Sequence, residues 1–161
     1  MLRTTELNSH ARVPSSATRY VRTMTGFFMV LEDGDNIFQQ LEGMMKAEEI
    51  PAATISGIGF GNFTFGYFDF EKKDYQPKVF EEVELAAMVG SLAWQHDNPS
   101  IHIHGVITRS DFTAHGGHML EGVVSKGTVE ITIIVHNEKF ERIKDKAMGA
   151  NVLCLRNCRI N

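Results

Sequence analysis

The 161-residue sequence lacks the features that would place it in a membrane or on a secretory route. No apolar run approaches the roughly 20 residues that a membrane-spanning helix requires. The N-terminal stretch MLRTTELNSHARVPSSATR contains no apolar segment of the kind found in secretory signals. We therefore expect a protein without a membrane segment and with a cytoplasmic location.

Cysteine is scarce, and basic residues are not in excess. Two cysteines, Cys154 and Cys158, are too few for a disulfide framework in a chain of this size, and free thiols are the favoured interpretation. Sixteen Lys and Arg stand against twenty Asp and Glu, which gives a net charge of −4. This balance does not favour wrapping a polyanion. The densest basic stretches, EKK and RIKDK, have acids nearby and are interpreted as solvated surface.

The spacing of apolar residues predicts one main helix between residues 35 and 50. Asp35 is the expected N-cap, because its carboxylate can accept amide hydrogens of the first turn. Pro51 marks the end of the helix. The residues expected to face the core at helical spacing are Ile37, Phe38, Leu41, Met44 and Met45.

Apolar residues at every second position predict strands after the helix. In TVEITIIVH, Val129, Ile131, Ile133 and Val135 share one face, and a wetter opposite face suits an antiparallel sheet. The stretch GIGFG lacks GxGxxG spacing and precedes a strand, so it is interpreted as a turn or bulge. The predicted class is α+β, with an antiparallel, curled sheet of about six strands and one main helix packed on it.

The chain is long enough for one domain with a substantial core. We expect a flexible N-terminal segment over residues 1–18 and a single domain over residues 19–146. Residues 147–161 are expected to form a C-terminal tail.

Four of the seven histidines occur in IHIHGVITRSDFTAHGGHML, residues 101–120. His102 and His104 lie two apart in a predicted strand and therefore project to the same face. Gly116 and Gly117 permit a close approach of the backbone, after which His118 can complete a three-nitrogen site. Three histidines with an open fourth position suit a divalent ion, zinc above all.

Other polar residues are candidates for supporting roles around this site. His115 and Arg109 flank the turn and are candidates for a second shell or a pocket entrance. Glu130, polar in an apolar strand, is a candidate to orient an imidazole, or is a surface residue. Exposed HxH pairs without any ligand also occur, so a polar surface cluster stays an alternative. HExxH is absent, and no glutamate follows HxH at the cupin spacing.

The segment HIHGVITRSDFTAHGGHMLEG resembles the signature of the PPC domain, the plants and prokaryotes conserved domain. Further stretches are similar to this family in the same order, namely MVLEDGDNIFQQL, ISGIGFGNFTFGYFD, FEEVELAAMVGSLAW and GTVEITI. The resemblance covers about residues 20–145. It is closest to the free-standing prokaryotic type, because the sequence contains no Arg-Gly-Arg-Pro AT-hook.

The resemblance implies an α/β-type domain that usually forms a homotrimer. It also implies that His102, His104 and His118 are candidate metal ligands. Prokaryotic members are often labelled DNA-binding proteins, so two functions follow as hypotheses. The first is a trimeric, zinc-type metal-binding domain with a small-molecule pocket, and the alternative is a DNA-binding or transcription-associated regulator. We expect no nucleic-acid-binding residues here, and whether the site is catalytic stays open.

Overall fold

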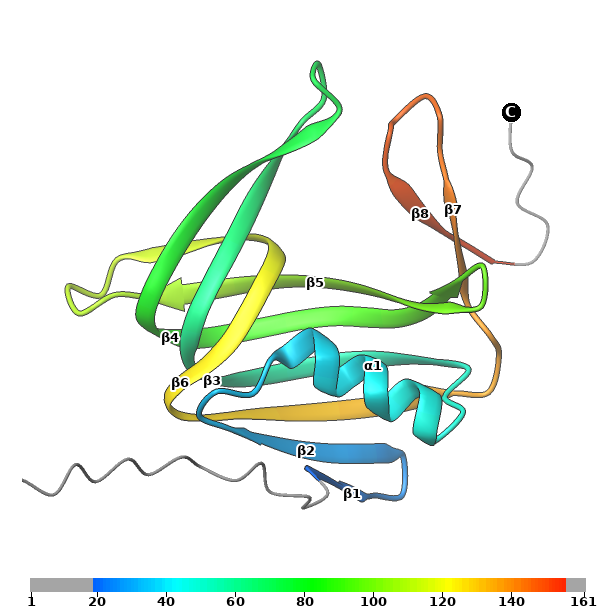
Figure 1. Ribbon diagram of the computed structural model, residues 1–161, viewed down its shortest axis with the longest axis horizontal. Coiled ribbons are helices and arrows are strands. Elements are labelled where there is room, and N and C mark those ends of the chain that lie inside the picture. Colours follow the sequence, from blue (N-terminus) through cyan, green and yellow to red (C-terminus); the bar gives the residue numbers. More distant parts are fainter. Residues whose placement is uncertain (1–18, 156–161) are drawn as a thin grey trace, which may run out of the picture.

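A long, strongly curved sheet and one short helix make up the described part of the protein (Figure 1). The computed structural model describes residues 19–155. The expected flexible segment 1–18 and Cys158 lie outside the described residues. The elements in chain order are β1 (Tyr20–Arg22), β2 (Gly26–Glu32), α1 (Ile37–Ala47), β3 (Ala52–Asp69), β4 (Asp74–Gln95), β5 (Asn98–Thr108), β6 (Ala114–His136), β7 (Glu141–Lys144) and β8 (Asn151–Cys154).

Within residues 19–155 the sheet has eight strands, so the expectation of about six antiparallel strands is wrong in detail. The strands β3, β4 and β6 are 18, 22 and 23 residues long, because β-bulges let a long strand bend instead of ending. The Gly-rich stretch GIGFG is such a place, with register shifts in β3 between Gly57 and Phe63. One pairing is parallel, that of β4 with β7 at Trp94 and Glu141. The short strands β1, β7 and β8 raise the number of strands above the expected six.

Four strands form a closed ring of hydrogen-bonded pairs. The main path of the sheet runs β1-β2-β6-β3-β4-β7-β8, and β5 pairs with both β4 and β6. The pairs β6–β3, β3–β4, β4–β5 and β5–β6 are all antiparallel. The ring forces the sheet to curl, as predicted, and brings β5 against the N-terminal half of β6.

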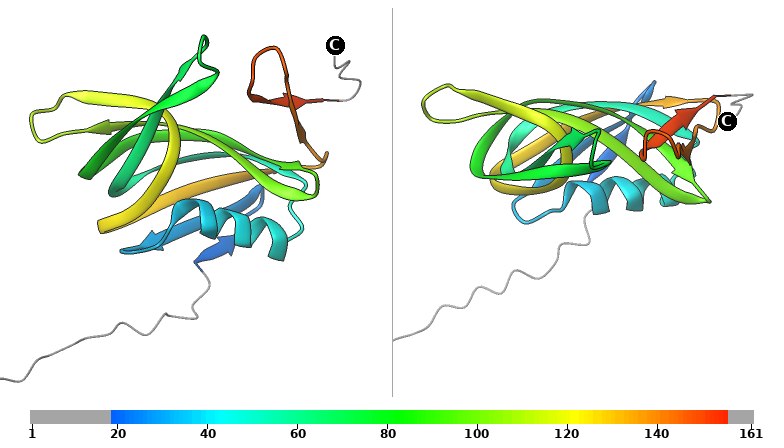
Figure 2. Two further views of the ribbon diagram at one scale, coloured as in Figure 1. Left: turned by 45° about the horizontal axis from the view of Figure 1, so that its top comes forward. Right: turned by 90° about the horizontal axis from the view of Figure 1, so that it is seen from above.

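Helix α1 packs against one face of the sheet (Figure 2). Four of its five predicted core residues are buried, and Phe38 is partly buried against the same core. The N-cap is Asn36, whose side chain accepts a hydrogen bond from the Gln39 amide at 3.1 Å, and not the expected Asp35. Asp35 instead pairs with Arg19 at 3.0 Å.

Among residues 19–155, no helix is long and apolar enough to cross a membrane.

Two hairpin ends rise from the same side of the sheet (Figure 1). One is the β3–β4 tip, and the other is the β7–β8 hairpin, in which Glu141 pairs with Cys154. The segment expected as a tail after residue 146 therefore contains a strand. Cys154 is disulfide-bonded, so the interpretation of free thiols is wrong for this residue. The space between the two rising hairpins lies over β5 and is where the candidate site is found.

Candidate metal centre

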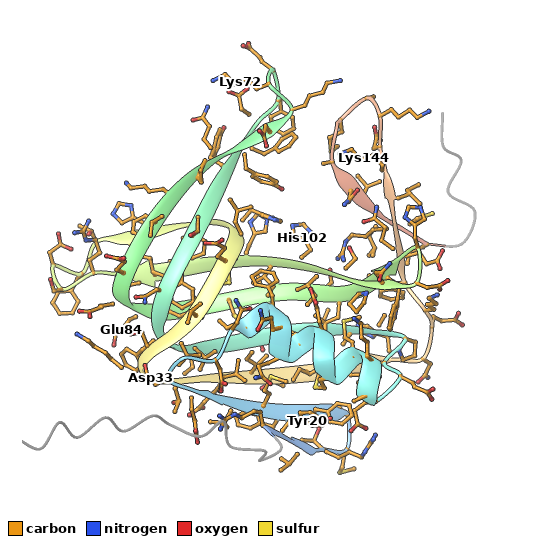
Figure 3. All side chains as sticks on the ribbon, in the orientation of Figure 1. Tyr20, Asp33, Lys72, Glu84, His102 and Lys144 are labelled. Carbon is orange, nitrogen blue, oxygen red and sulfur yellow. The ribbon has the colours of Figure 1, made fainter. Side chains whose placement is uncertain are left out.

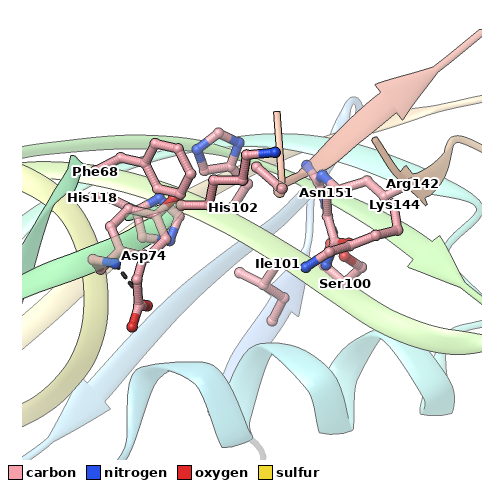
Figure 4. Close-up of a pocket in the computed structure, with 13 residues that line it drawn as sticks. Phe68, Asp74, Ser100, Ile101, His102, His118, Arg142, Lys144 and Asn151 are labelled. Carbon is pink, nitrogen blue, oxygen red and sulfur yellow. Dashed lines mark hydrogen bonds between the residues drawn. The ribbon is translucent and has the colours of Figure 1, made fainter. Parts of the chain in front are cut away.

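Strands β5 and β6 place three histidines on one face of the sheet. His102 and His104 share a face of β5, because successive side chains of a strand alternate. Figure 4 shows Ile101 on the α1 side of β5 and His102 on the opposite side. In the β5–β6 ladder His104 lies directly opposite His118, so His118 projects to the same face as His104.

The three imidazoles converge on one point. The ring centroid of His102 lies 5.1 Å from that of His104 and 4.9 Å from that of His118. One ligand nitrogen from each ring lies within 4.8 Å of the other two. Tyr75 stacks on His118 with a centroid distance of 4.5 Å, which restrains that ring. Figure 3 shows His102 in the space between the β3–β4 tip and the β7–β8 hairpin.

Two glycines allow this approach of β6 to its neighbours. A Cβ atom at Gly116 would lie 2.4 Å from the carbonyl oxygen of Gly105 on β5. A Cβ atom at Gly117 would lie 3.0 Å from the carbonyl oxygen of Gly66 on β3. Because Cβ atoms essentially never come that close to another atom, a side chain at Gly116 would push β6 away from β5.

Burial favours the neutral form of two of the imidazoles. Burial, with smaller contributions from the charges of His102, His104 and Arg142, lowers the pKa of His118 from 6.5 to about 4. The pKa of His102 is also lowered, by burial first and then by the charges of Arg142 and His104. Nδ1 of His118 is buried and has no hydrogen-bond partner among the described residues. Neutral imidazoles with free lone pairs are the form that binds a metal ion.

The donor set fits a borderline divalent cation such as zinc. Tetrahedral ligands at about 2.0–2.1 Å from zinc lie about 3.3 Å apart, so the imidazoles need to close only modestly. Within residues 19–155, no carboxylate belongs to the cluster. Calcium and magnesium prefer oxygen ligands and match this set poorly.

The other predicted site residues lie apart from the trio. His115 pairs with Ile107 and stacks on Phe80 at a centroid distance of 5.2 Å. Arg109 is exposed in the β5–β6 turn, where its amide donates to the Thr113 carbonyl at 3.1 Å.

Glu130 lies farther along β6 than His118, opposite Val30 and Ile58. It lines a second cavity of about 270 Å³ with Glu84 and does not line the cavity beside the histidines. The structure therefore brings Glu130 to a different part of the sheet from the imidazoles that it was a candidate to orient.

Arg142 is the residue near the site that sequence reasoning missed. The stretch RIKDK was interpreted as solvated surface, which is wrong for Arg142, since its exposed fraction is 4 %. Alternation along the short strand β7 would point Ile143 inward and Arg142 outward, so the pattern carries no signal for this burial. Hydrogen bonds to Ser91 and Ser100 hold its guanidinium beside His102.

A curled sheet, one packed helix and a three-histidine cluster define a small mixed α and β domain with a candidate metal centre. Residues 18–137 match the family model of the Plants and Prokaryotes Conserved (PCC) domain. The chain belongs to this family, the one that its histidine segment resembles. A comparison with curated proteins found no match.

Solved structures with this fold include close and distant relatives. A protein from Ralstonia eutropha JMP134, named "putative DNA-binding protein", is 45% identical with a TM-score of 0.82, and the match covers 85% of this chain and 96% of that one. A metal-containing protein from Archaeoglobus fulgidus is 27% identical with a TM-score of 0.72, over 80% and 92% of the two chains. A plant- and prokaryote-conserved protein from Pyrococcus horikoshii is 27% identical with a TM-score of 0.70, over 81% and 92%.

The lowered pKa of His118 predicts a specific pH dependence in the metal-free protein. The unfolded chain takes up a proton on His118 near pH 6.5, whereas the folded chain does so near pH 4. Stability from this group is therefore present above pH 6.5 and is lost as pH falls toward 4. Histidine NMR titration should show one imidazole that protonates near pH 4 and disappears in His118→Asn. A His118 signal that titrates at 6.5 would contradict the proposed burial effect.

Proposed function

We propose that the protein is a metal-binding domain that holds one divalent ion, zinc above all, through His102, His104 and His118. The observation that carries the proposal is the convergence of three imidazole nitrogens within 4.8 Å. In addition, Nδ1 of His118 is buried and has no hydrogen-bond partner among the described residues. The metal-containing relative from Archaeoglobus fulgidus supports it. A cytoplasmic location is part of the same proposal.

The site opens onto a cavity of about 300 Å³, which is the size of a small-molecule pocket. A zinc ion with three protein ligands and an open position acts as a Lewis acid that polarises a bound oxygen. The chain supplies the walls: Tyr75 stacks on His118, and Phe68 packs edge-on against Tyr75 at 5.1 Å. These rings exclude water from one side of the cavity.

Purified protein should bind about one zinc ion per chain, and His104→Ala should weaken binding more than about 100-fold. The reason is that loss of a supporting residue alone typically costs 10–100-fold, and His104 is a direct ligand in this proposal. Titration calorimetry with zinc measures the affinity. His115→Ala is the matched control, because His115 stacks on Phe80 outside the trio, and it should bind zinc like the wild type. Equal and negligible uptake by wild type and His104→Ala would refute the metal site.

We further propose that the domain assembles as a homotrimer through the exposed face of its sheet. Ile58, Val89 and Val106 are 55%, 60% and 42% exposed. Val89 lies directly opposite His104 in the β4–β5 ladder, so an apolar surface adjoins the histidines. Apolar patches of this kind mark contact surfaces. The family resemblance favours a second and a third copy of the chain as the partners that cover this apolar surface.

Light scattering should give three times the chain mass for the wild type. Val89→Glu should shift the protein toward the monomer, because a buried, unpaired carboxylate is costly in an apolar interface. Val21→Glu is the control, since Val21 is 65% exposed on β1 at the far end of the sheet path. A wild-type monomer, or a Val89→Glu trimer as stable as the wild type, would contradict this interface.

DNA binding is the second candidate function, favoured by the name of the Ralstonia eutropha relative. Several surface cations are already paired with acids. This pairing reduces the positive charge that is available to contact a DNA phosphate backbone. Lys126 pairs with Glu82 at 2.6 Å, and Lys139 pairs with Asp97 at 2.9 Å. The net charge of −4 also disfavours binding to the negatively charged phosphate backbone.

Duplex DNA titrated with the protein at low and moderate salt decides between the two functions. Direct phosphate contacts would make the affinity fall steeply as salt rises. We expect no binding of this kind at low salt in the zinc-loaded protein. A dissociation constant in the nanomolar range with a steep salt dependence would favour the DNA-binding function instead.

A further inference from the structure

The cavity beside the histidines is rich in positive charge (Figure 4). Lys73 from the β3–β4 tip and Arg142 and Lys144 from β7 line it, together with His102 and His118. Asp74 is the one carboxylate among its described lining residues, and it accepts a hydrogen bond from the Tyr75 amide at 2.8 Å. Cations therefore outnumber acids around this cavity, although the chain as a whole carries a net charge of −4.

Arg142 is the one charged side chain that is buried among the described residues. Its guanidinium donates to the Ser91 hydroxyl at 2.6 Å, to the Ser91 carbonyl at 3.3 Å and to the Ser100 hydroxyl at 3.3 Å. It also donates to the Ser100 carbonyl. All of these acceptors are neutral, and no salt bridge to Arg142 is found within residues 19–155. A buried charge is costly unless an opposite charge compensates it.

The strand register places this guanidinium next to the metal ligands. Ser100 lies two residues before His102 on β5, on the same face and about 6.6 Å away. Ser91 is directly opposite His102 in the β4–β5 ladder. Because Arg142 is held by both serines, its guanidinium lies beside His102 and lines the same cavity as His102 and His118. A molecule of a few carbon atoms is long enough to contact both the guanidinium and a metal ion held by the histidines.

We propose that the cavity binds a small organic acid that has one carboxylate near Arg142 and a second oxygen donor directed at the metal ion. The inference rests on the proposed metal site, which supplies the second anchor. Charge-assisted hydrogen bonds to carboxylates are the strong ones. Nη1 and Nη2 of Arg142 already donate to the two serines, so Nε is the guanidinium donor that a carboxylate would contact. Phe68 and Tyr75 provide the apolar wall for the carbon chain. The volume of about 300 Å³ suits a compact ligand and is too small for a polynucleotide.

The alternative role for Arg142 is purely structural, namely to tie β7 to β4 and β5. The two roles differ in what the wild-type protein binds. A structural arginine makes no distinction between a dicarboxylate and its neutral diamide, whereas an anion-binding arginine does. Succinate and succinamide have the same carbon skeleton and form the matched probe pair.

The test is titration calorimetry of zinc-loaded protein with malonate, succinate, glutarate and succinamide. The best dicarboxylate should bind at least about 10-fold more tightly than succinamide, as one charge-assisted hydrogen bond implies. Affinity should also depend on chain length, because the two anchors are fixed in space. Zinc content measured after dialysis against each acid excludes simple removal of the metal. Equal affinity for succinate and succinamide, or no binding of any dicarboxylate, would overturn the proposal.

Arg142→Met should lower the affinity for the best dicarboxylate at least about 10-fold while zinc binding is kept. Lys139→Met is the control, because Lys139 pairs with Asp97 and Glu141 away from the cavity, and it should behave like the wild type. Unchanged dicarboxylate binding in a folded Arg142→Met protein contradicts the role of this residue. If that variant does not fold, the wild-type comparison of succinate with succinamide decides alone.

The same experiment separates this proposal from the one on which it rests. Zinc titration of the wild type comes first, and a lack of zinc uptake refutes the metal site itself. Zinc uptake followed by no preference for dicarboxylates leaves the metal site intact and refutes only the organic-acid pocket.

Discussion

The pairing of β5 with β6 is the constraint on which the rest of the structure depends. It closes the ring of β3, β4, β5 and β6, and it sets His104 opposite His118. A slip of one residue would turn His118 toward the core and bring the buried Met119 to the outer face. The free energy of burying the core therefore also fixes the register of the histidines. The site is held in place by the same interactions that stabilise the fold.

The close approach of β6 to β5 and the burial of His118 are linked in this ring. Gly116 has a carbonyl oxygen of the next strand where a side chain would otherwise lie, so β6 can lie flat against β5. The β3–β4 tip then rises beside the site and places Tyr75 over His118. The burial that results lowers the pKa of His118, which keeps its imidazole neutral at physiological pH. Backbone geometry thus extends to lower pH the range in which a candidate ligand stays neutral.

Local periodicity predicted part of this arrangement and could not predict the rest. The HxH spacing of His102 and His104 and the glycines before His118 are local signals, and the structure brings these residues together. The helix was found by its apolar spacing, with its N-cap displaced by one residue. The number of strands was misjudged because β1, β7 and β8 are only three or four residues long, too short to show a clear alternating pattern. The burial of Arg142 depends on strands distant in sequence, and no local pattern encodes it.

The position of Arg142 has an energetic consequence for the metal centre. A divalent ion held by the histidines would be repelled by the guanidinium, because both cations would face the same cavity. The neutral hydrogen bonds to Ser91 and Ser100 hold the guanidinium in place but do not cancel its charge. An anion bound between the two cations offsets both repulsion and burial. Metal and anion would then strengthen each other's binding reciprocally, because the coupling free energy is shared by the two sites.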